Sequence, residues 1–447
     1  MSMSQPIVTV PYVEGTQDYT DVVRSKITSL EALGGGILKF EDNRKYRFTP
    51  ASSILVPNGV TLKGGHATLI SLEHPIPKKN PADQYGNVES YLFEKNGGSG
   101  LIAEDLTFHS TISNYCLIAK DVVSPEFRRL KFTGWWYPAI WIQHCSNAQL
   151  SDISYETYGG GTLLASAFVH GGSATRLRAV GIFEGVDFNE SITNFTVVDS
   201  YFKDTREEAI DINGSSKIQI LNSTFINCST EKKNTSIHIT GSNNAKVGHT
   251  TDVLIQGNTF IESASGAVRV SPGEPTPSFC SNIRIVNNVS RVYTVTPNGA
   301  HIKLYGTRVS NVLIENNTLE GGHRGIDFEA GTTTGVGYDF VIRNNTIIEA
   351  LYEGINVQYL HSPVLEGNNV IRCGVADKLR FGIMLQQPLL GTVTLKSGLL
   401  TENANGGFAA NDGVKVKAIG VKSIANLTVP YYSSATSTLT LEGCILE

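Results

Sequence analysis

The sequence predicts an all-β solenoid, in which short strands wind into coils that stack along one axis. Six segments of alternating apolar residues each end in an Asn or Gly pair and a further apolar residue, and their first residues are 35, 30, 29, 28 and 23 positions apart. A loose period with strand-like alternation is the signature of a repeat architecture. The segments are Ile220–Phe225, Ile255–Phe260, Ile285–Val289, Ile314–Leu319, Ile342–Ile347 and Leu365–Val370.

The bulk composition agrees with a turn-rich β protein and excludes several other classes. The 447 residues include 44 glycines, and charged residues make up 17% of the chain. The net charge of -5 argues against a nucleic-acid partner, which would need a basic face. No apolar run reaches the roughly 18 residues of a membrane span. The six cysteines lack metal-ligand spacing, so we interpret them as small buried apolar residues.

Residues 1–65 are predicted to form an N-terminal cap. Residues 20–33 carry apolar side chains at helical spacing, and three glycines at 34–36 end that pattern. Short strand-like segments divided by turn residues follow. A short amphipathic helix at this place would cover the open end of a solenoid, whose unpaired edge would otherwise invite aggregation.

Residues 66–390 are predicted to form the coils, and residues 391–447 further coils or a C-terminal cap. Each coil has a strand that ends in the Asn or Gly pair, a turn, and a second short strand with period-two alternation. Aliphatic residues of the short strand point inward, and the residue between them points outward. These strands are 139–143, 167–169, 185–189, 209–213, 236–240, 267–271, 301–305, 325–329, 354–358 and 382–386.

The tripeptide Asn-x-Ser/Thr occurs at ten positions, many of them in or near the repeat register. Glycosylation would need a secretory route, and residues 1–10 show no basic segment followed by an apolar one. We therefore interpret these asparagines as turn residues that tolerate left-handed φ and as stacked side-chain amides.

The outward residues of successive short strands form a predicted ladder. Neighbouring strands lie about 4.8 Å apart, so residues distant in sequence become neighbours. The ladder reads Trp141, Phe168, Asp187, Asp211, His238, Arg269, Lys303, Asp327, Asn356 and Met384.

Five carboxylates concentrate in two adjacent coils of this ladder and are the candidate catalytic groups. Two carboxylates at close range push one pKa up, which a general acid near neutral pH needs. His238, Arg269, Lys303 and Tyr305 follow as candidate substrate contacts, and the two cations suit an anionic group. The carboxylates are Glu184, Asp187, Glu207, Glu208 and Asp211.

The three tryptophans, Trp135, Trp136 and Trp141, form a second constellation. Flat aromatic faces bind sugar rings, and core packing is the alternative for Trp135 and Trp136. Trp141 points outward by the alternation, which favours a sugar platform there.

Residues 20–390 resemble the pectate-lyase-like right-handed parallel β-helix superfamily. The helix, then the segments 34–40 and 54–64, are similar to the N-terminal coils of its polysaccharide depolymerases, including phage tailspikes. The resemblance implies a right-handed single-stranded parallel β-helix with an N-terminal capping helix, and as a fold-level match it does not name a substrate. It leaves open whether the chain forms a homotrimer, as tailspike β-helices do.

A narrower resemblance is to polygalacturonases, which carry Asn-Thr-Asp, Asp-Asp, Gly-His-Gly and Arg-Ile-Lys on four successive coils. Glu184 stands at the first Asp, Glu207 and Glu208 at the Asp pair, and Arg269 at the Arg. Thr235 stands where the His would be, and Ser271 where the Lys would be. The resemblance thus implies the location of a cleft more than its chemistry.

Three functions follow as hypotheses. The first is a glycoside hydrolase without a cofactor, in which the paired carboxylates act as acid and base. The second is a polysaccharide lyase, in which His238, Arg269 and Lys303 act on a uronate and the carboxylates hold Ca²⁺. The third is a non-catalytic glycan-binding protein. With no visible secretory signal, we expect a virion-associated protein, one exported by a non-classical route, or a cytoplasmic one.

Overall fold

The computed structural model describes residues 5–49, 52–72, 91–231, 235–241, 248–263, 265–272, 278–294, 299–305, 308–329, 337–376 and 380–447. The chain divides into two compact units, one up to Arg206 and one from Glu207 onward. Strands dominate both units, and within each unit equivalent strands pair in parallel.

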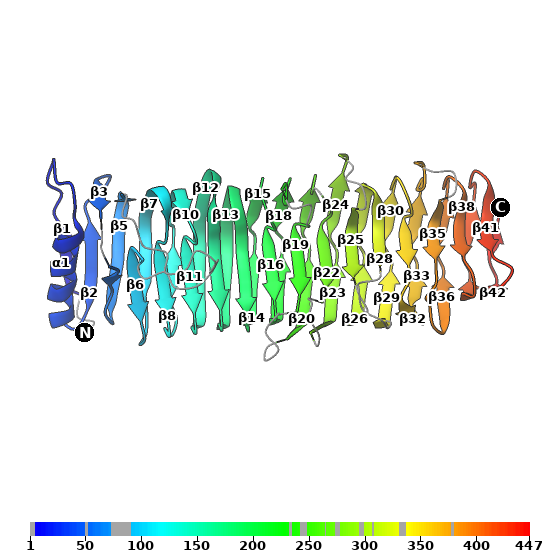
Figure 1. Cartoon of the computed structure of the whole chain (residues 1–447), viewed down its shortest axis with the longest axis horizontal. Helices are drawn as coiled ribbons and strands as arrows, with labels where there is room; N and C mark the ends of the chain where they lie inside the picture. Colours follow the sequence, from blue (N-terminus) through cyan, green and yellow to red (C-terminus); the bar gives the residue numbers. More distant parts are fainter. Residues whose placement is uncertain are drawn as a thin grey trace. The chain divides into compact units, whose positions relative to one another are not determined.

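The first unit begins with the predicted helix, α1 (Thr20–Ala32), which buries Val23, Ile27 and Leu30. Figure 1 shows α1 beside β1 and β2 at the start of this unit. Tyr19, just before the helix, packs edge-on against Tyr46 with ring centroids 4.9 Å apart, and both rings are buried. The helix therefore covers the apolar interior of the first coil.

Parallel strands fill the rest of the first unit. They are β1 (Ile7–Val10), β2 (Gly36–Phe40), β3 (Lys45–Phe48), β4 (Ile54–Leu55), β5 (Val60–Ser71), β6 (Phe93–Asn96), β7 (Ile102–Asn114), β8 (Leu117–Lys120), β9 (Glu126–Arg128), β10 (Lys131–Trp136), β11 (Ile140–Gln143), β12 (Ser146–Ala167), β13 (His170–Glu190), β14 (Thr193–Val198) and β15 (Tyr201–Lys203).

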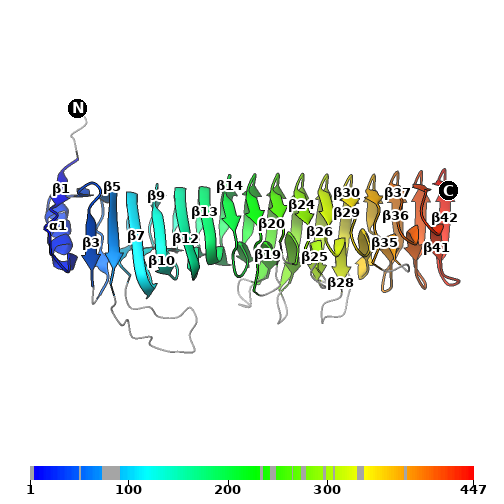
Figure 2. The ribbon, with the colours of Figure 1, turned by 90° about the horizontal axis from the view of Figure 1, so that it is seen from above.

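The second unit repeats a coil of three strands, and equivalent strands of successive coils stack into three parallel sheets (Figures 1 and 2). Sheet 1 contains the predicted short strands. Its members are β16 (Ile210–Asn213), β19 (Ile237–Thr240), β22 (Val268–Ser271), β25 (Ala300–Tyr305), β28 (Arg324–Glu329), β31 (Ile355–Val357), β35 (Phe381–Leu385), β38 (Gly406–Ala410) and β41 (Val429–Ser433).

Sheets 2 and 3 contain the two strands that complete each coil. Sheet 2 consists of β17 (Ser216–Leu221), β20 (His249–Gln256), β23 (Phe279–Val286), β26 (Val309–Glu315), β29 (Gly337–Arg343), β32 (Leu360–His361), β33 (Val364–Glu366), β36 (Thr392–Lys396), β39 (Lys415–Ile419) and β42 (Thr438–Glu442). Sheet 3 consists of β18 (Thr224–Ile226), β21 (Thr259–Ile261), β24 (Val289–Val292), β27 (Thr318–Gly321), β30 (Thr346–Ile348), β34 (Asn369–Ile371), β37 (Leu399–Thr401), β40 (Lys422–Ile424) and β43 (Ile445–Leu446). Strands β36 to β43 continue the parallel pairing, so the segment from residue 391 onward forms further coils.

The core of the second unit is a set of columns in which each apolar side chain lies on its equivalent in the next coil. One column runs Ile220, Ile255, Ile285, Ile314 and Ile342, and all five side chains are buried. Full burial of such a side chain contributes roughly 1.5–3 kcal/mol. The columns therefore favour one register between coils, because a one-residue slip would turn every aliphatic residue outward.

A buried ladder of asparagine amides runs between sheets 2 and 3. The Nδ2 atoms of Asn258, Asn288, Asn317 and Asn345 each donate to Oδ1 of the next asparagine along the ladder, at 2.9–3.1 Å, and Asn368 receives the last bond. Each Nδ2 also donates to a backbone carbonyl of the preceding coil. Of these asparagines, Asn288 belongs to an Asn-x-Ser/Thr tripeptide, and for Asn288 the interpretation as a stacked amide is confirmed.

The residue before each ladder asparagine has a left-handed backbone. Asn287, Asn316 and Asn344 have φ of 56°, 54° and 54°, and Gly257 and Gly367 have 69° and 64°. Asparagine and glycine adopt the left-handed conformation with less steric strain than other residues. This preference explains why each repeat has an Asn or Gly pair at this turn. The turn directs the second asparagine inward, where its amide joins the ladder.

The cysteines match their interpretation as small apolar residues. Cys116, Cys145, Cys228, Cys280 and Cys373 are buried as free thiols, and Cys444 is partly exposed. Burial raises the pKa of the Cys280 and Cys373 thiols to about 12, so both stay protonated at neutral pH.

The amide ladder predicts a large difference between two adjacent asparagines. Replacing Asn317 with Ala removes the acceptor of the Asn288 backbone N–H and the donor to the Ile285 carbonyl, both buried. We expect the free energy of unfolding to fall by at least about 2 kcal/mol. The control is Asn316→Gly, because Asn316 is exposed and its φ of 54° suits glycine. Urea unfolding midpoints measure both changes, and equal effects of the two variants would contradict the role of the ladder.

Candidate functional site

The predicted ladder is correct through most of the second unit. Asp211 pairs with His238, His238 with Arg269, Arg269 with Lys303, and Lys303 with Asp327 in the parallel register of sheet 1. Asn356 and Met384 continue the row. The aliphatic residues on either side, such as Ile210 and Ile212, are fully buried in the core.

A second outward row lies two residues further along the same strands. Asn213 pairs with Thr240, Thr240 with Ser271, and Tyr305 with Glu329. Side chains two residues apart on a strand share a face, so both rows belong to one surface. We call the part of this surface formed by β16, β19, β22 and β25 the polar face.

His238 is the centre of the polar face. Its Nδ1 atom lies 3.3 Å from Asp211 Oδ1 and 3.8 Å from Glu208 Oε1, and its Nε2 atom lies 2.7 Å from Ser271 Oγ. Asn213 Nδ2 donates to Asp211 Oδ2 over 2.9 Å and orients that carboxylate. The imidazole therefore connects two carboxylates on one side with a hydroxyl group on the other.

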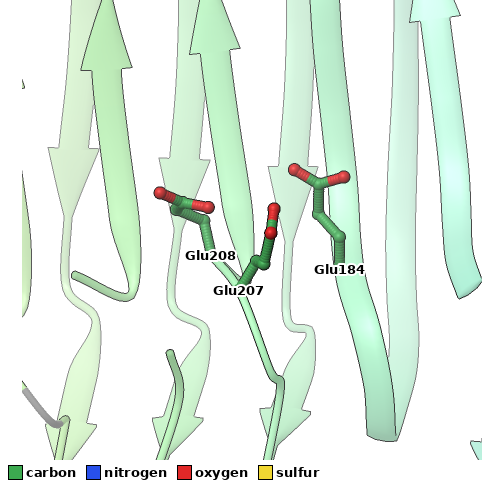
Figure 3. Close-up of side chains that lie close together, drawn as sticks. All are labelled: Glu184, Glu207 and Glu208. Atoms are coloured by element: carbon green, nitrogen blue, oxygen red, sulfur yellow. The ribbon is translucent and has the colours of Figure 1, made fainter. Parts of the chain in front are cut away.

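The side chains on this part of the face remain accessible to solvent. His238 and Asp211 are 17% and 20% exposed, and Arg269 and Ser271 are partly exposed. Glu207 and Glu208, in the bend that leads into β16, are buried (Figure 3).

Arg269, Lys303 and Tyr305 form the basic part of the polar face. The Arg269 guanidinium carbon and the Lys303 Nζ atom lie 4.7 and 4.6 Å from the Tyr305 ring centroid. Cations at this distance interact favourably with the ring face. Lys303 Nζ also lies 3.1 Å from Glu329 Oε2, so its charge is shared with a carboxylate.

An ionic network that sequence reasoning did not predict covers the next coils. Arg324 Nε lies 2.7 Å from Glu353 Oε2, Arg324 Nη1 lies 3.3 Å from Asp327 Oδ2, and Arg380 Nη1 lies 2.8 Å from Glu353 Oε1. Asp327 and Glu353 are fully buried. Asp327, predicted to point to solvent, is instead enclosed by these charged neighbours.

Within this network the pKa values of two neighbouring carboxyl groups, Asp327 and Glu329, shift in opposite directions. Burial raises the pKa of Asp327 to about 6, against the attraction of the Arg324 guanidinium. Burial also opposes ionisation of Glu329, but the Lys303 ammonium outweighs it and holds the Glu329 pKa below its usual range. The sequence did contain one indication of this ionic network. Glu329 follows Asp327 by two residues on β28, so the alternation places both carboxylates on the same face.

The first unit holds Glu184 and Asp187, both on β13 and both buried. Thr162 Oγ1 donates to Glu184 Oε2 over 3.4 Å, and Asn189 Nδ2 donates to Asp187 Oδ2 over 2.7 Å. Figure 3 draws the Glu184 side chain with those of Glu207 and Glu208. The predicted cleft that would join Glu184 and Asp187 with the carboxylates of the second unit stays a prediction.

The predicted ladder is wrong at Phe168. Trp141 pairs with Ala165, and Ala165 pairs with Asp187. Phe168 lies beyond the end of β12, has a φ of 55°, and its ring lies 4.9 Å from that of His144. The strand β12 ends at Ala167, before Phe168, and Ala165 takes the ladder position instead.

A small hollow in the first unit lies beside Trp141 and Asp187. Tyr115, Tyr137 and Pro138 also line it. The Trp141 Nε1 atom is buried and has no hydrogen-bond partner among the described residues. Aromatic rings, a carboxylate and a free indole donor therefore meet at one concave place.

The other tryptophans differ from each other. Trp135 is 45% exposed, which leaves its ring open to a ligand. Trp136 is fully buried, and its Nε1 donates to the Thr133 carbonyl over 3.0 Å. The prediction that Trp136 binds substrate is therefore wrong, since its ring belongs to the core.

The fold and the polar face define a class, an all-β solenoid of parallel coils with charged groups displayed in register on one sheet. The family described as "Right handed beta helix region" matches residues 92–252 and 233–422. The chain therefore belongs to the right-handed β-helix family, and the predicted fold class is confirmed.

Two tailspike structures show the same fold at low identity, and an adhesin structure is also similar to the chain. The tailspike protein of E. coli bacteriophage HK620 in complex with pentasaccharide has a TM-score of 0.54 at 11% identity, over 95% of this chain and 75% of that chain. A double mutant of the same tailspike, also in complex with pentasaccharide, gives 0.53 at 10% identity over the same shares. The Streptococcus pneumoniae surface protein and adhesin PfbA gives 0.41 at 14% identity, over 98% and 100%.

No curated protein sequence matches the chain. Among the described residues, no helix is both long and apolar enough to cross a membrane.

His301, on β25 two residues before Lys303, is a buried neutral imidazole. Its Nδ1 lies 2.7 Å from Ser290 Oγ and its Nε2 lies 3.1 Å from the Gly321 carbonyl, so Nε2–H donates and Nδ1 accepts. Burial lowers the His301 pKa from 6.5 to about 4.

This depressed pKa predicts acid destabilisation. Unfolding restores a pKa near 6.5, so the unfolded chain binds a proton that the folded chain refuses between pH 6.5 and 4. The stabilising contribution is complete above pH 6.5 and falls by about 3 kcal/mol as the pH drops through 4. Melting temperatures across this range should fall less steeply in His301→Gln than in the parent chain. Parallel curves for the two proteins would contradict this assignment.

Proposed function

We propose that this protein binds a polysaccharide and cleaves its glycosidic bonds by hydrolysis. The observation that carries the proposal is the polar face, where Asp211, His238 and Arg269 stand in register and open to solvent. Chains of sugar units suit such a surface, because hydroxyl and carboxylate groups along the polymer meet repeated polar side chains. The HK620 tailspike structures with pentasaccharide support a glycan as the ligand class.

The aromatic hollow of the first unit supports the same ligand class. A sugar ring stacks on an indole through apolar contact while its hydroxyl groups bond to polar tips. Trp141 offers the ring and an unpaired Nε1–H, and Asp187 offers an acceptor in the same hollow. Trp135, half exposed, is a further candidate contact.

Hydrolysis requires one carboxylic acid to protonate the leaving oxygen and one carboxylate to activate water or attack the sugar. Glu207, Glu208 and Asp211 are the candidates in the second unit, with Glu184 or Asp187 as partner. Asp211 suits direct contact with the sugar, because it is partly exposed and Asn213 fixes its orientation. The resemblance to polygalacturonases favours inversion at the anomeric carbon.

A polysaccharide lyase is the second candidate, favoured by the row His238, Arg269 and Lys303. In that reaction His238 removes the proton α to a uronate carboxylate, the two cations neutralise the carboxylate, and the glycosidic oxygen leaves. Carboxylates would hold Ca²⁺ there, whose preferred ligands are oxygens. The unsaturated product absorbs ultraviolet light, whereas a hydrolase product gains the mass of water.

A glycan-active β-helix works where it meets extracellular polysaccharide. We therefore propose a virion-associated or surface location, and a homotrimer as the assembly to test by light scattering.

The carboxylate roles predict the effect of two isosteric substitutions. Glu208→Gln and Asp211→Asn should each lower the rate of depolymerisation by at least about 100-fold, with little change in glycan binding. The control is Glu442→Gln, because Glu442 is exposed on β42 in the last coils. Product mass spectrometry on a polysaccharide panel measures the rates. Unchanged depolymerisation in both variants would contradict the assignment, and absence of any cleavage by the parent chain would favour the non-catalytic glycan-binding hypothesis.

The hollow predicts a separate effect on affinity. Trp141→Ala removes the stacking surface and the free donor, and should weaken binding of a cleaved oligosaccharide about tenfold. Tyr158→Ala serves as control, since Tyr158 is 92% exposed. Titration calorimetry measures both, and an equal affinity of Trp141→Ala and the parent chain would exclude the hollow as a subsite.

A further inference from the structure

We propose that Ser271, His238 and Asp211 form a nucleophile–base–carboxylate triad that hydrolyses carboxylic esters. That the ester is an O-acyl group on a glycan rests on the proposed function. The proposal of ester hydrolysis is independent of the proposed function, because cleavage of an ester involves no glycosidic bond. The triad crosses three neighbouring strands of sheet 1, β22, β19 and β16.

The distances fit the roles. Ser271 Oγ lies 2.7 Å from His238 Nε2, within hydrogen-bond range, and His238 Nδ1 lies 3.3 Å from Asp211 Oδ1. A serine is activated when a base at hydrogen-bond distance can accept its proton and a third group orients that base. Ser271, His238 and Asp211 have this arrangement. The separation on the Asp211 side is slightly long, as is common before substrate binds.

The two carboxylates decide which nitrogen of His238 carries the proton. Asp211 and Glu208 both face Nδ1, and they favour a proton on that atom. Nε2 is then the acceptor, and the Ser271 hydroxyl donates to it. Asp211 Oδ1 is buried and has no hydrogen-bond partner among the described residues, so a small rotation of the imidazole would supply one.

The scaffold holds the three groups rigidly. His238 and Asp211 are register partners on adjacent strands, and Ser271 is the partner of Thr240 on the next strand. Asn213 fixes the outer oxygen of Asp211. Groups placed on strands keep their geometry better than groups placed on loops.

Arg269 supplies positive charge where the reaction develops negative charge. It lies two residues before Ser271 on β22, on the same face, and stacks on Tyr305 at 4.7 Å. A cation held in place stabilises an oxyanion without reorganising during the reaction.

The reaction balances with water alone. Ser271 Oγ attacks the acyl carbon while its proton moves to His238 Nε2, and Arg269 stabilises the oxyanion. The bond from the acyl carbon to the alcohol oxygen then breaks, and the alcohol leaves with the proton from His238. Water attacks the acyl-serine and gives its proton to His238. The Ser271–acyl bond breaks, Ser271 Oγ recovers the proton, and a carboxylic acid is released.

The test uses the full chain with two probes that contain no sugar. p-Nitrophenyl acetate reports hydrolysis, and a fluorophosphonate labels an activated serine, which peptide mass spectrometry then locates. We expect hydrolysis above the buffer rate, a single label on Ser271, and loss of both in Ser271→Ala. The control is Ser310→Ala, a partly exposed serine of sheet 2, which should keep both.

Each outcome decides the proposal. A label on Ser271 in the parent chain supports the triad even if Ser271→Ala fails to fold. Hydrolysis that Ser271→Ala retains, a label on another residue, or no hydrolysis and no label would overturn it. If the protein does not cleave glycans, ester hydrolysis and fluorophosphonate labelling can still be measured. The proposals of glycan cleavage and of ester hydrolysis can therefore be contradicted independently.

Discussion

The structure of the second unit depends on one constraint, the hydrogen bonding of asparagine amides buried between successive coils. Each amide from Asn288 to Asn345 both accepts from the ladder neighbour before it and donates to the one after it, and none has water to replace a lost partner. A coil shifted by one residue would leave these groups unsatisfied and would also break the isoleucine columns. The hydrogen bonds of the buried amides and the packing of the isoleucine columns therefore favour the same register between coils.

The same register also positions the side chains of the polar face. The ladder amides and the polar face belong to the same coils, so fixing one fixes the other. His238 approaches Asp211, Glu208 and Ser271 although these residues span more than 60 positions of sequence. Further along sheet 1 the same register produces a different result, because Arg324 and Arg380 close over Asp327 and Glu353. The same repeat thus forms a partly exposed polar segment in one place and a buried ionic segment in another.

Alternation and the turn signal were enough to predict the fold, the helix α1 and the row from Asp211 to Met384. They failed at Phe168, because the pairing of β12 with β13 has register shifts between Glu156 and Gly160 and between Ser166 and Ala167, and alternation alone does not locate such shifts. They failed at Trp136, because a tryptophan can fill a solenoid core as well as a surface. The contact of Ser271 with His238 lies outside the predicted ladder, because the ladder contains one outward residue of each strand and Ser271 is the second outward residue of β22.

The central claim is that register brings the polar side chains together, and paired cysteines measure register directly. Thr240 and Ser271 are partners on β19 and β22, so their Cα atoms lie about 4.8 Å apart, within the range of a disulfide. Thr240 and Arg269 are diagonal, at roughly 8 Å, beyond that range. Mild oxidation followed by peptide mass spectrometry should show a disulfide in the Thr240→Cys, Ser271→Cys pair and none in the Thr240→Cys, Arg269→Cys pair. A disulfide only in the diagonal pair would mean that the coils stack in another register and that the polar face described above does not exist.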